Sequence, residues 1–444
     1  MCNFGGLMKI YMIGIGGVSM SAIAKHLLIK GFFVSGSDKQ LNNFTNELEK
    51  LGAKIYNNNL IEVEKADVII YNSAISEDNL ELTFAKKLNK AIFTRAEVLS
   101  KIISSFTNSI GVSGSHGKTT VTAMISNIYK QAGLPFTTYI GGEDVNLSNF
   151  YTCLNSKTII SEICEYKKNI LNFKVNNGVV LNVDNDHLDS YDNITDLKNA
   201  FVTFLNKSNN AFINADDLVL SAYKNATTFA INSNATFRAV NLKNNDGFYS
   251  FNVKYNGKNL CYLTLKVAGL HNVYNALASF SVAYKNKIKV NVIKEALENF
   301  TNVKRRNEFL FTINKTPVYA DYCHHPTEIK NLIDTVNLKY KRALFIFQPH
   351  TYSRTKILFN DFVNLLKDKN VVFYKTYPAR EKFNYYGGAY YLSLKCNKKP
   401  FFNNFNNLIN YLTNNNKNYD AIYVLGAGNL YDEFIKYKNK ARLI

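Results

Sequence analysis

One stretch constrains the fold of this chain more than any other. Residues 109–125 read SIGVSGSHGKTTVTAMI, an apolar strand that leads into a glycine-rich loop and then into an amphipathic helix near Lys118. Backbone N–H groups in such a loop point at an anion, and the dipole of the following helix adds to the attraction. The stretch therefore predicts a phosphate-binding loop in an α/β domain.

The residue types in this loop indicate a nucleoside triphosphate. Gly114 and Gly117 carry no side chain that would block a phosphate, Lys118 can reach the β and γ phosphates, and the Thr119 hydroxyl can bind Mg²⁺. Position 112 is valine where the common G-x-x-x-x-G-K-[ST] pattern has glycine. We expect ATP to contact Gly114, Ser115, His116, Gly117, Lys118, Thr119 and Thr120.

Acidic residues follow two later strands of the same domain. Glu162 and Glu165 come after the strand TII, and NVDNDHLDSY (182–191) comes after GVVL. Mg²⁺ prefers oxygen ligands and keeps several waters. A carboxylate from Glu165, with His187 at or near the ion, would complete a metal site with Thr119.

A second glycine loop, GIGGVS (14–19), opens the chain as part of a strand–helix–strand unit. It resembles the dinucleotide-binding fingerprint, and Asp38 follows at about the distance expected for a ribose contact. Position 19 is serine where the third glycine belongs. Taken alone, this loop also fits an NAD-dependent dehydrogenase.

The C-terminal part has three predicted strands, RALFIF, NVVFYK and DAIYVL, and each ends in a polar loop. Because ligands in doubly wound sheets bind beyond the carboxyl ends of the strands, QPHTYSRT (348–355), TYPARE (376–381) and GAGNLY (426–431) are candidate site loops. Residues 247–268 predict a hairpin that turns at Asn256-Gly257. The Asn-rich stretch 402–418 is expected to be a solvated surface.

Size and composition limit the class of protein. The chain has 444 residues, which favours two or three domains, and a formal net charge of +19. Its lysines are scattered among Asn, Tyr, Phe and Ile, so we expect attraction of small anions and no nucleic-acid partner. The six cysteines show no C-x-x-C pair, and no apolar run approaches the roughly 18 residues of a membrane span. We expect a cytoplasmic protein with no membrane partner.

Together the motifs resemble those of the Mur ligases, over nearly the whole chain. Six of the seven histidines lie in these motifs, and His26, the exception, is expected to be structural. The motifs are GIGGVSMSAIA (14–24), SGSD (35–38), GSHGKTT (114–120), EICEY (162–166), NVDNDHLDSY (182–191), AGLHNVYNALA (268–278), KRRNEF (304–309), DYCHHPTEI (321–329), FQPHTYSRT (347–355), YPARE (377–381) and GAGN (426–429).

The resemblance implies three α/β domains: a Rossmann-like UDP-binding domain (1–105), a central P-loop-like ATPase domain with a mixed sheet (106–303) and a C-terminal Rossmann-like domain (304–444). It implies an ATP- and Mg²⁺-dependent amide ligase of peptidoglycan precursor synthesis. The enzyme would join L-alanine to the lactyl carboxylate of UDP-N-acetylmuramic acid through an acyl phosphate. As oligomeric state we expect a monomer or a weak homodimer.

The resemblance also assigns residues to the reactants. The UDP-sugar would meet Gly14, Gly16, Gly17, Ser19, Ser37, Asp38 and Ser73. ATP would also meet His271, Asn272, Asn275, Arg306 and Asp321. The amino acid would meet Tyr322, His324, His350 and Arg354. The catalytic residues would be Lys118, His187, His324 and Arg354.

Several alternatives stay open. A related ligase would attach a preformed peptide to the same sugar nucleotide, or an amino acid to a later precursor. A nucleotide-binding regulator without catalysis would show damage at Lys118 or at the acidic metal positions. Arg305 and Arg306 would meet phosphate or sugar, although one of the two could instead belong to a solvated basic turn. Members of the family usually carry Asp at the positions of Ala320 and Asn429, which affects the contacts expected there.

Overall fold

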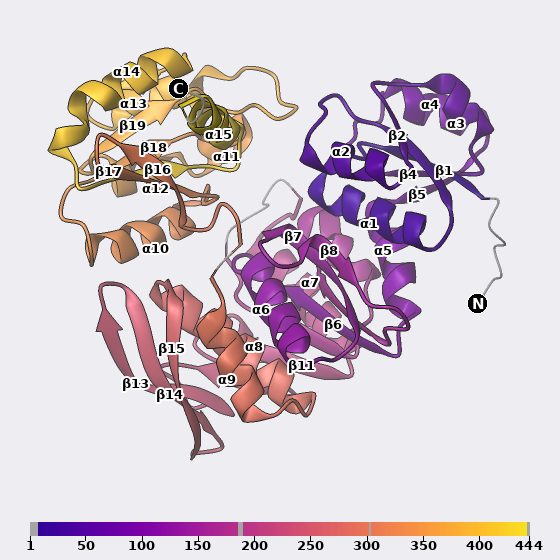
Figure 1. Cartoon of the computed structure of the whole chain (residues 1–444), viewed down its shortest axis with the longest axis horizontal. Helices are drawn as coiled ribbons and strands as arrows, with labels where there is room; N and C mark the ends of the chain where they lie inside the picture. The colour runs from indigo at the N-terminus through magenta and orange to yellow at the C-terminus, as the bar shows by residue number, and fades with distance from the viewer. Residues whose placement is uncertain (1–7, 185–189, 302, 442–444) are drawn as a thin grey trace. The chain divides into compact units, whose positions relative to one another are not determined.

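The computed structural model describes residues 8–184, 190–301 and 303–441 (Figure 1). Its contacts divide the chain into two compact units. The first consists of residues 1–240, 252–262 and 274–297, and the second of residues 241–251, 263–273 and 298–444. Within the described ranges, no helix is both long and apolar enough to span a lipid bilayer.

The first unit begins with a five-stranded parallel sheet in the order β3-β2-β1-β4-β5, drawn in indigo to violet in Figure 1. In this doubly wound order the chain runs outward from β1 to β2 and β3 and then crosses to β4 on the other side of β1, and doubly wound sheets bind ligands beyond the carboxyl ends of the strands at such a reversal. The strands are β1 (Lys9–Ile13), β2 (Phe33–Ser37), β3 (Lys54–Tyr56), β4 (Val68–Tyr71) and β5 (Ala91–Thr94). The helices are α1 (Val18–Ile29), α2 (Asn43–Lys50), α3 (Leu60–Lys65), α4 (Leu80–Lys87) and α5 (Arg95–Ser104).

The second sheet has ten strands in the order β15-β14-β13-β12-β11-β10-β6-β9-β7-β8. It is mixed, because β6 pairs in parallel with β9 and β10 while β7 and β8 are antiparallel. The strands are β6 (Asn108–Ser113), β7 (Phe136–Asp144), β8 (Ser148–Thr152), β9 (Thr158–Glu162), β10 (Asn177–Val180), β11 (Asn210–Asn214), β12 (Thr227–Ala230), β13 (Phe237–Asn245), β14 (Phe248–Tyr255) and β15 (Lys258–Ala268). The helices are α6 (Lys118–Gln131), α7 (Ile194–Lys207), α8 (Leu270–Lys285) and α9 (Val290–Asn299), with short 3-10 helices η1 (Tyr166–Asn172) and η2 (Leu220–Ala222).

The predicted hairpin is present at the edge of this sheet. Asn256 and Gly257 join β14 to β15 with φ values of 45° and 81°. A two-residue hairpin turn of type I′ has positive φ at both central residues and matches the twist of its strands, and Asn-Gly adopts these angles at low cost. The local sequence therefore determines this turn.

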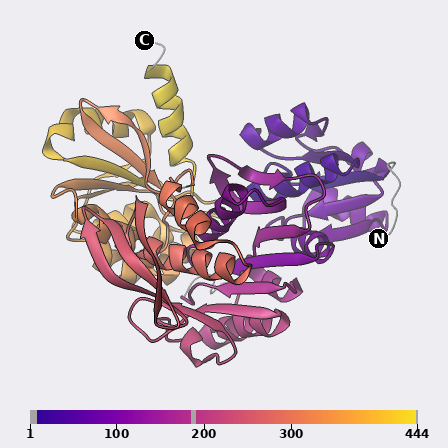
Figure 2. The same ribbon diagram turned by 60° about the horizontal axis from the view of Figure 1, so that its bottom comes forward.

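The third sheet has six strands in the order β16-β17-β21-β18-β19-β20 and is drawn in orange to yellow in Figures 1 and 2. Only β16 runs antiparallel to its neighbour. The strands are β16 (Glu308–Ile313), β17 (Thr316–Asp321), β18 (Ala343–Phe347), β19 (Val371–Tyr374), β20 (Phe401–Phe402) and β21 (Ala421–Leu425). The helices are α10 (Pro326–Asn337), α11 (Tyr352–Ile357), α12 (Phe359–Leu366), α13 (Ala389–Lys395), α14 (Phe405–Asn415) and α15 (Leu430–Ala441), with 3-10 helices η3 (Tyr385–Gly387) and η4 (Asn416–Asn418).

The Asn-rich stretch differs from the expectation of a solvated surface. Most of it forms α14, and Leu408, Ile409 and Leu412 on one face of this helix are buried in the C-terminal core. Apolar residues one helical turn apart supply an apolar stripe even in a polar segment, so burial of that stripe determines the helix. Only the opposite face carries the solvated asparagines.

In the first unit, α1 packs against the central sheet through His26. The His26 ring stacks on Tyr139 at 6.0 Å between centroids and meets Phe106 and Phe150 edge-on. Burial of the ring lowers the pKa of His26 to about 4, so it is neutral at pH 7. This aromatic packing fits the structural role expected for His26, and it joins α1 to β7 and β8.

Candidate functional site

The phosphate-binding loop lies between β6 and α6. Gly114 and Gly117 have φ values of 130° and 86°, a region that strains any residue with a side chain. A Cβ on Gly117 would also lie 2.7 Å from Asn275 Oδ1, and one on Gly114 would lie 3.0 Å from Leu181 N. Both glycines are therefore required by backbone conformation and by a close neighbour, which is Asn275 on α8 for Gly117 and the chain after β10 for Gly114.

The chain after β10 holds this loop in place. Asn182 accepts from His116 N through Oδ1 at 2.8 Å and donates through Nδ2 to His116 O at 3.1 Å. Asp184 Oδ2 lies 2.9 Å from His116 Nε2, and the Ser115 hydroxyl accepts from Asp184 N. Within the described residues, no hydrogen bond involves the first-turn amides of Lys118, Thr119 and Thr120, which is the arrangement that binds anions at a helix start.

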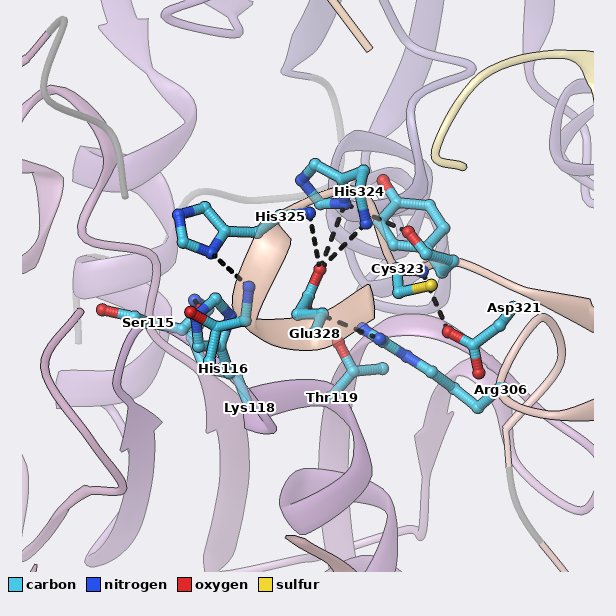
Figure 3. Close-up of polar contacts among 12 residues, drawn as sticks. Ser115, His116, Lys118, Thr119, Arg306, Asp321, Cys323, His324, His325 and Glu328 are labelled. Atoms are coloured by element: carbon cyan, nitrogen blue, oxygen red, sulfur yellow. Dashed lines mark hydrogen bonds and ion pairs between the residues drawn. The ribbon is translucent and has the colours of Figure 1, made fainter. Parts of the chain in front are cut away.

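The Lys118 ammonium lies inside the loop. It donates to Gly114 O at 2.6 Å, to Ser115 O at 3.1 Å and to Glu165 Oε1 at 3.0 Å. Burial alone would lower the pKa of Lys118, but the nearby Glu165 carboxylate outweighs it and raises that pKa above its ordinary value. Lys118 is therefore cationic at neutral pH, at the place where a polyphosphate would lie (Figure 3).

The neighbouring acidic residue, Glu162, contacts Thr119 instead. Thr119 Oγ1 donates to Glu162 Oε2 at 2.8 Å, and Gly141 N donates to the same oxygen at 3.1 Å. A hydroxyl and a carboxylate oxygen side by side at a strand end are the hard oxygen donors that Mg²⁺ prefers. The donor set thus fits a magnesium ion. The carboxylate that contacts Thr119 is Glu162, whereas Glu165, the residue expected there, forms an ion pair with Lys118. His187 lies outside the described residues.

The residues expected near adenine are on helix α8 and fall in both units. Asn275 belongs to the first unit and is buried close to Gly117. His271 and Asn272 belong to the second unit, where Asn272 Nδ2 donates to Ala268 O and His271 is exposed. Within the first unit, the structure places Asn275 beside the phosphate loop.

The backbone amides of the first glycine loop, between β1 and α1, donate hydrogen bonds to oxygens of the protein itself. Gly14 N and Ile15 N both donate to Ser37 O, at 2.8 and 3.0 Å, and Gly17 N donates to Gly14 O at 3.3 Å. Gly16 N donates to Asp38 Oδ2 at 2.9 Å, so the Asp38 carboxylate caps this loop. A Cβ on Gly16 would lie 2.9 Å from that same oxygen.

Two of the three serines expected at the UDP-sugar, Ser37 and Ser73, make further contacts. The Ser37 hydroxyl is buried and donates to Glu81 Oε2 at 2.5 Å, and Tyr11 OH donates to Glu81 Oε1 at 2.5 Å. Glu81 was not singled out in the sequence, because a glutamate early in a helix carries no local sign of burial. Ser73 O accepts from Lys167 Nζ at 2.6 Å, which links the loop after β4 to η1.

In the second unit, the loops after β17, β18 and β19 bring four aromatic or imidazole rings together. The ring centroids of Tyr322 and His324 are 5.4 Å apart, and those of His324 and His350 are 5.7 Å apart. His350 stacks on Tyr377 at 5.6 Å, and Arg354 Nη1 lies 3.5 Å from His350 Nδ1. The structure thus gathers all four residues expected at the amino acid and adds Tyr377 from the YPARE motif.

A charged network lies beside this cluster (Figure 3). His324 N donates to Glu328 Oε2 at 3.1 Å, and Arg306 Nη1 lies 3.8 Å from Glu328 Oε1. Asp321 accepts from the amides of Asn307 and Cys323 at 2.8 and 2.9 Å. Burial raises the pKa of the Asp321 carboxyl, against the opposing charge of Arg306. Asp321 therefore orders the turn that carries Arg306.

Three residues organise the C-terminal loops. Arg305 Nη2 donates to Gly426 O and Gly428 O at 2.8 and 2.9 Å, so this arginine fastens the GAGN loop and is not a solvated basic turn. Gln348 is buried and donates to Asn429 Oδ1 at 3.1 Å, so asparagine at position 429 has an internal partner. Ala320 is buried in the sheet core.

Comparison with known proteins places this geometry in context. Residues 9–107 match the description "Mur ligase family, catalytic domain", and residues 112–283 match "Mur ligase middle domain". The UDP-N-acetylmuramate–L-alanine ligase of Aquifex aeolicus is 40% identical over 446 residues, covering 97% of this chain and 98% of that protein. The enzyme of the same name from Acetivibrio thermocellus is 38% identical, with 97% and 96% covered. The crystal structure of the UDP-N-acetylmuramate–alanine ligase MurC of Thermotoga maritima has a TM-score of 0.84 at 27% identity, covering 98% of this chain and 99% of that one.

Proposed function

The chain belongs to the Mur ligase family, and on that premise we propose that it joins L-alanine to the lactyl carboxylate of UDP-N-acetylmuramic acid at the expense of ATP, in the synthesis of peptidoglycan precursors. The observation that carries the proposal is full-length similarity to relatives that bear this activity in their names, at 40% and 38% identity. The phosphate loop of the first unit and the ring-and-arginine cluster of the second unit would supply two of the three sites that the reaction needs, those for ATP and for the amino acid.

The phosphate loop would activate the carboxylate. A carboxylate does not react with an amine at neutral pH because oxide would have to leave, so transfer of the γ-phosphoryl group makes an acyl phosphate whose leaving group is phosphate. Lys118 is cationic inside the loop and would offset the repulsion between the two anionic reactants. The remaining ATP contacts would come from Ser115, His116, Thr120 and Asn275, with His271, Asn272, Arg306 and Asp321 contributing from the second unit.

Mg²⁺ fits beside the loop, and Thr119 and Glu162 would hold it, with Glu165 and His187 as further candidates. When bound there, the ion would neutralise charge on the β and γ phosphates. Glu165 has a separate task in this chain, because it keeps the Lys118 ammonium charged and fixed at 3.0 Å.

The amino acid would bind at the cluster of the second unit. Arg354 offers a planar fork of donors that suits a carboxylate. His324 and His350 lie beside it, and one of them would take the proton that the alanine amine must lose before it attacks the acyl phosphate. Tyr322 would close the pocket wall on the side of Arg306, whose guanidinium lies 5.3 Å from its ring.

Three further expectations are part of the proposal. The functional domains are residues 1–105 for the UDP-sugar, 106–303 for ATP and 304–444 for the amino acid. The protein acts in the cytoplasm, where its nucleotide substrates are made. It acts as a monomer or a weak homodimer.

The test is a measurement of ADP release with UDP-N-acetylmuramate and a panel of L-amino acids, with the tripeptide that a peptide-adding relative would use as a further reactant. We expect release to require the sugar nucleotide and to be fastest with L-alanine. Because a methyl group in a pocket discriminates by only about 1–3 kcal/mol, serine and glycine should give slower turnover rather than none. ADP release that depends on neither the sugar nucleotide nor an amino acid would exclude the ligase class. ADP release that requires the tripeptide would assign the protein to the peptide-adding branch of the family.

A further inference from the structure

Arg305 lies in the turn before β16 and connects this turn to the loops after β17 and β21. Its Nη2 donates to Gly426 O and Gly428 O at 2.8 and 2.9 Å, in the loop after β21. Its carbonyl oxygen accepts from Tyr322 N at 2.7 Å, and its own backbone N–H donates to Glu308 Oε2 at 2.8 Å. Both the main chain and the side chain of Arg305 are therefore engaged within the second unit.

The guanidinium of Arg305 also lies against two aromatic rings. Its central carbon is 4.8 Å from the ring centroid of Tyr322 and 4.8 Å from that of Tyr431 on α15. Tyr431 OH donates to Glu308 Oε2 at 3.1 Å, which fixes the second ring. Arg305 Nε is buried and has no hydrogen-bond partner in the described ranges. Because a guanidinium is planar and stacks on aromatic faces, the two rings hold the part of Arg305 that hydrogen bonds do not.

The turn that carries Arg305 has a backbone conformation that is uncommon outside glycine. The φ angles of Arg305 and Asn307 are 60° and 48°, in the left-handed region. Such conformations persist where the surrounding structure holds them, and they occur often at functional sites. Asp321 Oδ2 accepts from Asn307 N, and Glu308 Oε2 accepts from Arg305 N, at 2.8 Å each. The fold therefore fixes the direction in which the Arg305 side chain leaves this turn.

Tyr322 in turn contacts residues assigned above to the amino acid. Its ring centroid is 5.4 Å from that of His324 in a T-shaped pair, and the His324 ring is 5.7 Å from that of His350. Aromatic pairs have preferred edge-to-face geometries, so a shift of the Tyr322 ring would change the position that His324 prefers. A continuous series of ring contacts thus leads from Arg305 to the two histidines.

We propose that Arg305 is a positioning residue for the amino-acid site: it holds the Tyr322 ring against His324 and does not itself contact a reactant. This inference rests on the proposed function for the identity of the amino acid. Because Tyr322 would form a wall of the amino-acid pocket, a change in the position of its ring should weaken binding of L-alanine more than it slows the chemical steps.

The adjacent arginine has different partners. Arg306 Nη1 lies 3.8 Å from Glu328 Oε1, and its guanidinium lies 5.3 Å from the Tyr322 ring. The Nη2 donors of Arg305 are directed to two backbone carbonyl oxygens, which keeps these donors from a phosphate. The nucleotide contact of this turn is therefore assigned to Arg306, and changes at Arg305 should leave the KM for ATP unchanged.

The experiment is steady-state kinetics of ADP release by the full-length protein and by Arg305→Lys. Lysine keeps the positive charge and removes the plane that contacts the two rings. We expect the KM for L-alanine to rise by about fivefold or more. The kcat and the KM values for ATP and UDP-N-acetylmuramate should change by less than about twofold.

Arg342→Lys is the matched control, because it makes the same change at an exposed arginine of the same unit, which pairs with Asp420. It should leave all four kinetic constants unchanged. A rise in the KM for L-alanine that is as large in Arg342→Lys would overturn the inference, since Arg342 contacts no residue of the amino-acid site.

A second pair of variants tests whether Arg305 acts through Tyr322. Tyr322→Leu removes the ring and should itself raise the KM for L-alanine. In that background, Arg305→Lys should add less than about twofold, because residues that act through one contact have non-additive effects. If Arg305→Lys has its full effect in the Tyr322→Leu background, Arg305 does not act through the ring and the inference is wrong.

Two further results would overturn the inference while leaving the ligase proposal intact. One is an unchanged KM for L-alanine in Arg305→Lys, and the other is a rise confined to the KM for ATP, which would assign Arg305 to the nucleotide. If Arg305→Lys does not fold, Tyr431→Leu removes the other ring beside the guanidinium and should raise the KM for L-alanine by about twofold or more. An unchanged KM in Tyr431→Leu would then contradict the inference. If the unmodified protein shows no ADP release that depends on L-alanine, the proposed function itself fails, and this inference with it.

Discussion

The two glycine loops of the first unit occupy the same position in their sheets, and they differ in the partners of the cation that lies beside each loop. Each lies after a parallel strand and before a helix, at residues 14–17 and 114–117. In the second loop the cation, Lys118, comes from the loop's own helix and is held by Glu165. In the first loop the cation, Arg95, is the first residue of another helix, α5, donates from Nη1 to Ser19 Oγ at 3.0 Å and has no carboxylate partner in the described chain.

This difference matches the two tasks that we propose. A loop that transfers a phosphoryl group needs carboxylates close by, both to hold a metal ion and to fix the lysine, and Glu162 and Glu165 are there. A loop that only binds the UDP-sugar needs donors, and a nearby carboxylate would compete with the ligand. The Asp38 carboxylate is consistent with this, because it is occupied by the loop amide of Gly16.

The largest expected effect is on the second loop alone. Lys118→Ala should reduce the ADP-release rate by about 10³-fold or more, since it removes the charge that stabilises the transferring group. Affinity for UDP-N-acetylmuramate should be unchanged. Lys130→Ala, in the exposed last turn of the same helix, is the control and should keep full turnover. Loss of both turnover and sugar-nucleotide binding in Lys118→Ala would show that the loops are not separate sites.

The next effect concerns the packing that connects the loops, because His26 on α1 is buried against β7 and β8. Its folded-state pKa of about 4 lies below the ordinary value of 6.5, so the unfolded chain binds a proton first as pH falls. Stability from this group is therefore complete above pH 6.5 and is lost between pH 6.5 and 4, by about 3 kcal/mol in total.

His26→Leu should remove that pH dependence. Urea unfolding at pH 7.5 and at pH 4.5 measures it, and the drop in unfolding free energy between the two should be smaller for the variant by about 2–3 kcal/mol. Equal drops in both proteins would show that His26 is not the group that links proton uptake to the joining of α1 and the central sheet.

The third effect separates the two acidic residues of the second loop. Glu162→Gln keeps the shape but loses the charge beside Thr119, and we expect ADP release to fall by about 10²-fold, with a higher Mg²⁺ requirement. Glu295→Gln on α9, an exposed glutamate of the same unit, is the control. If Glu162→Gln requires the same Mg²⁺ concentration as the unmodified protein, Glu165 rather than Glu162 would be the metal ligand, and the separate roles given to these two residues would be wrong.

The smallest expected effect tests the proposal that the amino acid binds at Arg354 in the second unit and at neither glycine loop of the first unit. Arg354→Lys loses the planar fork, so the KM for L-alanine should rise by about tenfold while the KM values for ATP and the sugar nucleotide stay constant. Arg342→Lys, whose guanidinium pairs with Asp420 on the exposed surface, is the matched control. A rise in KM for ATP instead would assign Arg354 to the nucleotide.

Local patterns were sufficient for the parts of the site that are contiguous in sequence. The strand–loop–helix around Lys118, the Asn256-Gly257 turn and the polar loops after β18, β19 and β21 were all predicted correctly as structure. The reason is that glycine at positive φ, apolar strands and helix starts are determined within a few residues. The gathering of Tyr322, His324, His350 and Arg354 was expected from the resemblance to the Mur ligases, and it is consistent with parallel strands that end at a common edge.

The local patterns could not predict which side chain each charged residue contacts in the folded protein. Glu162 and Glu165 are three residues apart, and nothing local says that the first contacts Thr119 and the second Lys118. Glu81 beneath Ser37, and Arg95 against Ser19, are separated from their partners by 44 and 76 residues. The buried stripe of α14 was predicted wrongly as solvated surface, although leucines one turn apart were there to indicate it.

By itself, the sequence determined where the chain makes strands, anion-binding turns and helices, because backbone conformation and apolar spacing are short-range properties. Only the tertiary structure decided which charges meet and which remain unpaired, since the energy of a charge in a protein depends on the burial and the neighbours that folding brings to it from distant parts of the chain.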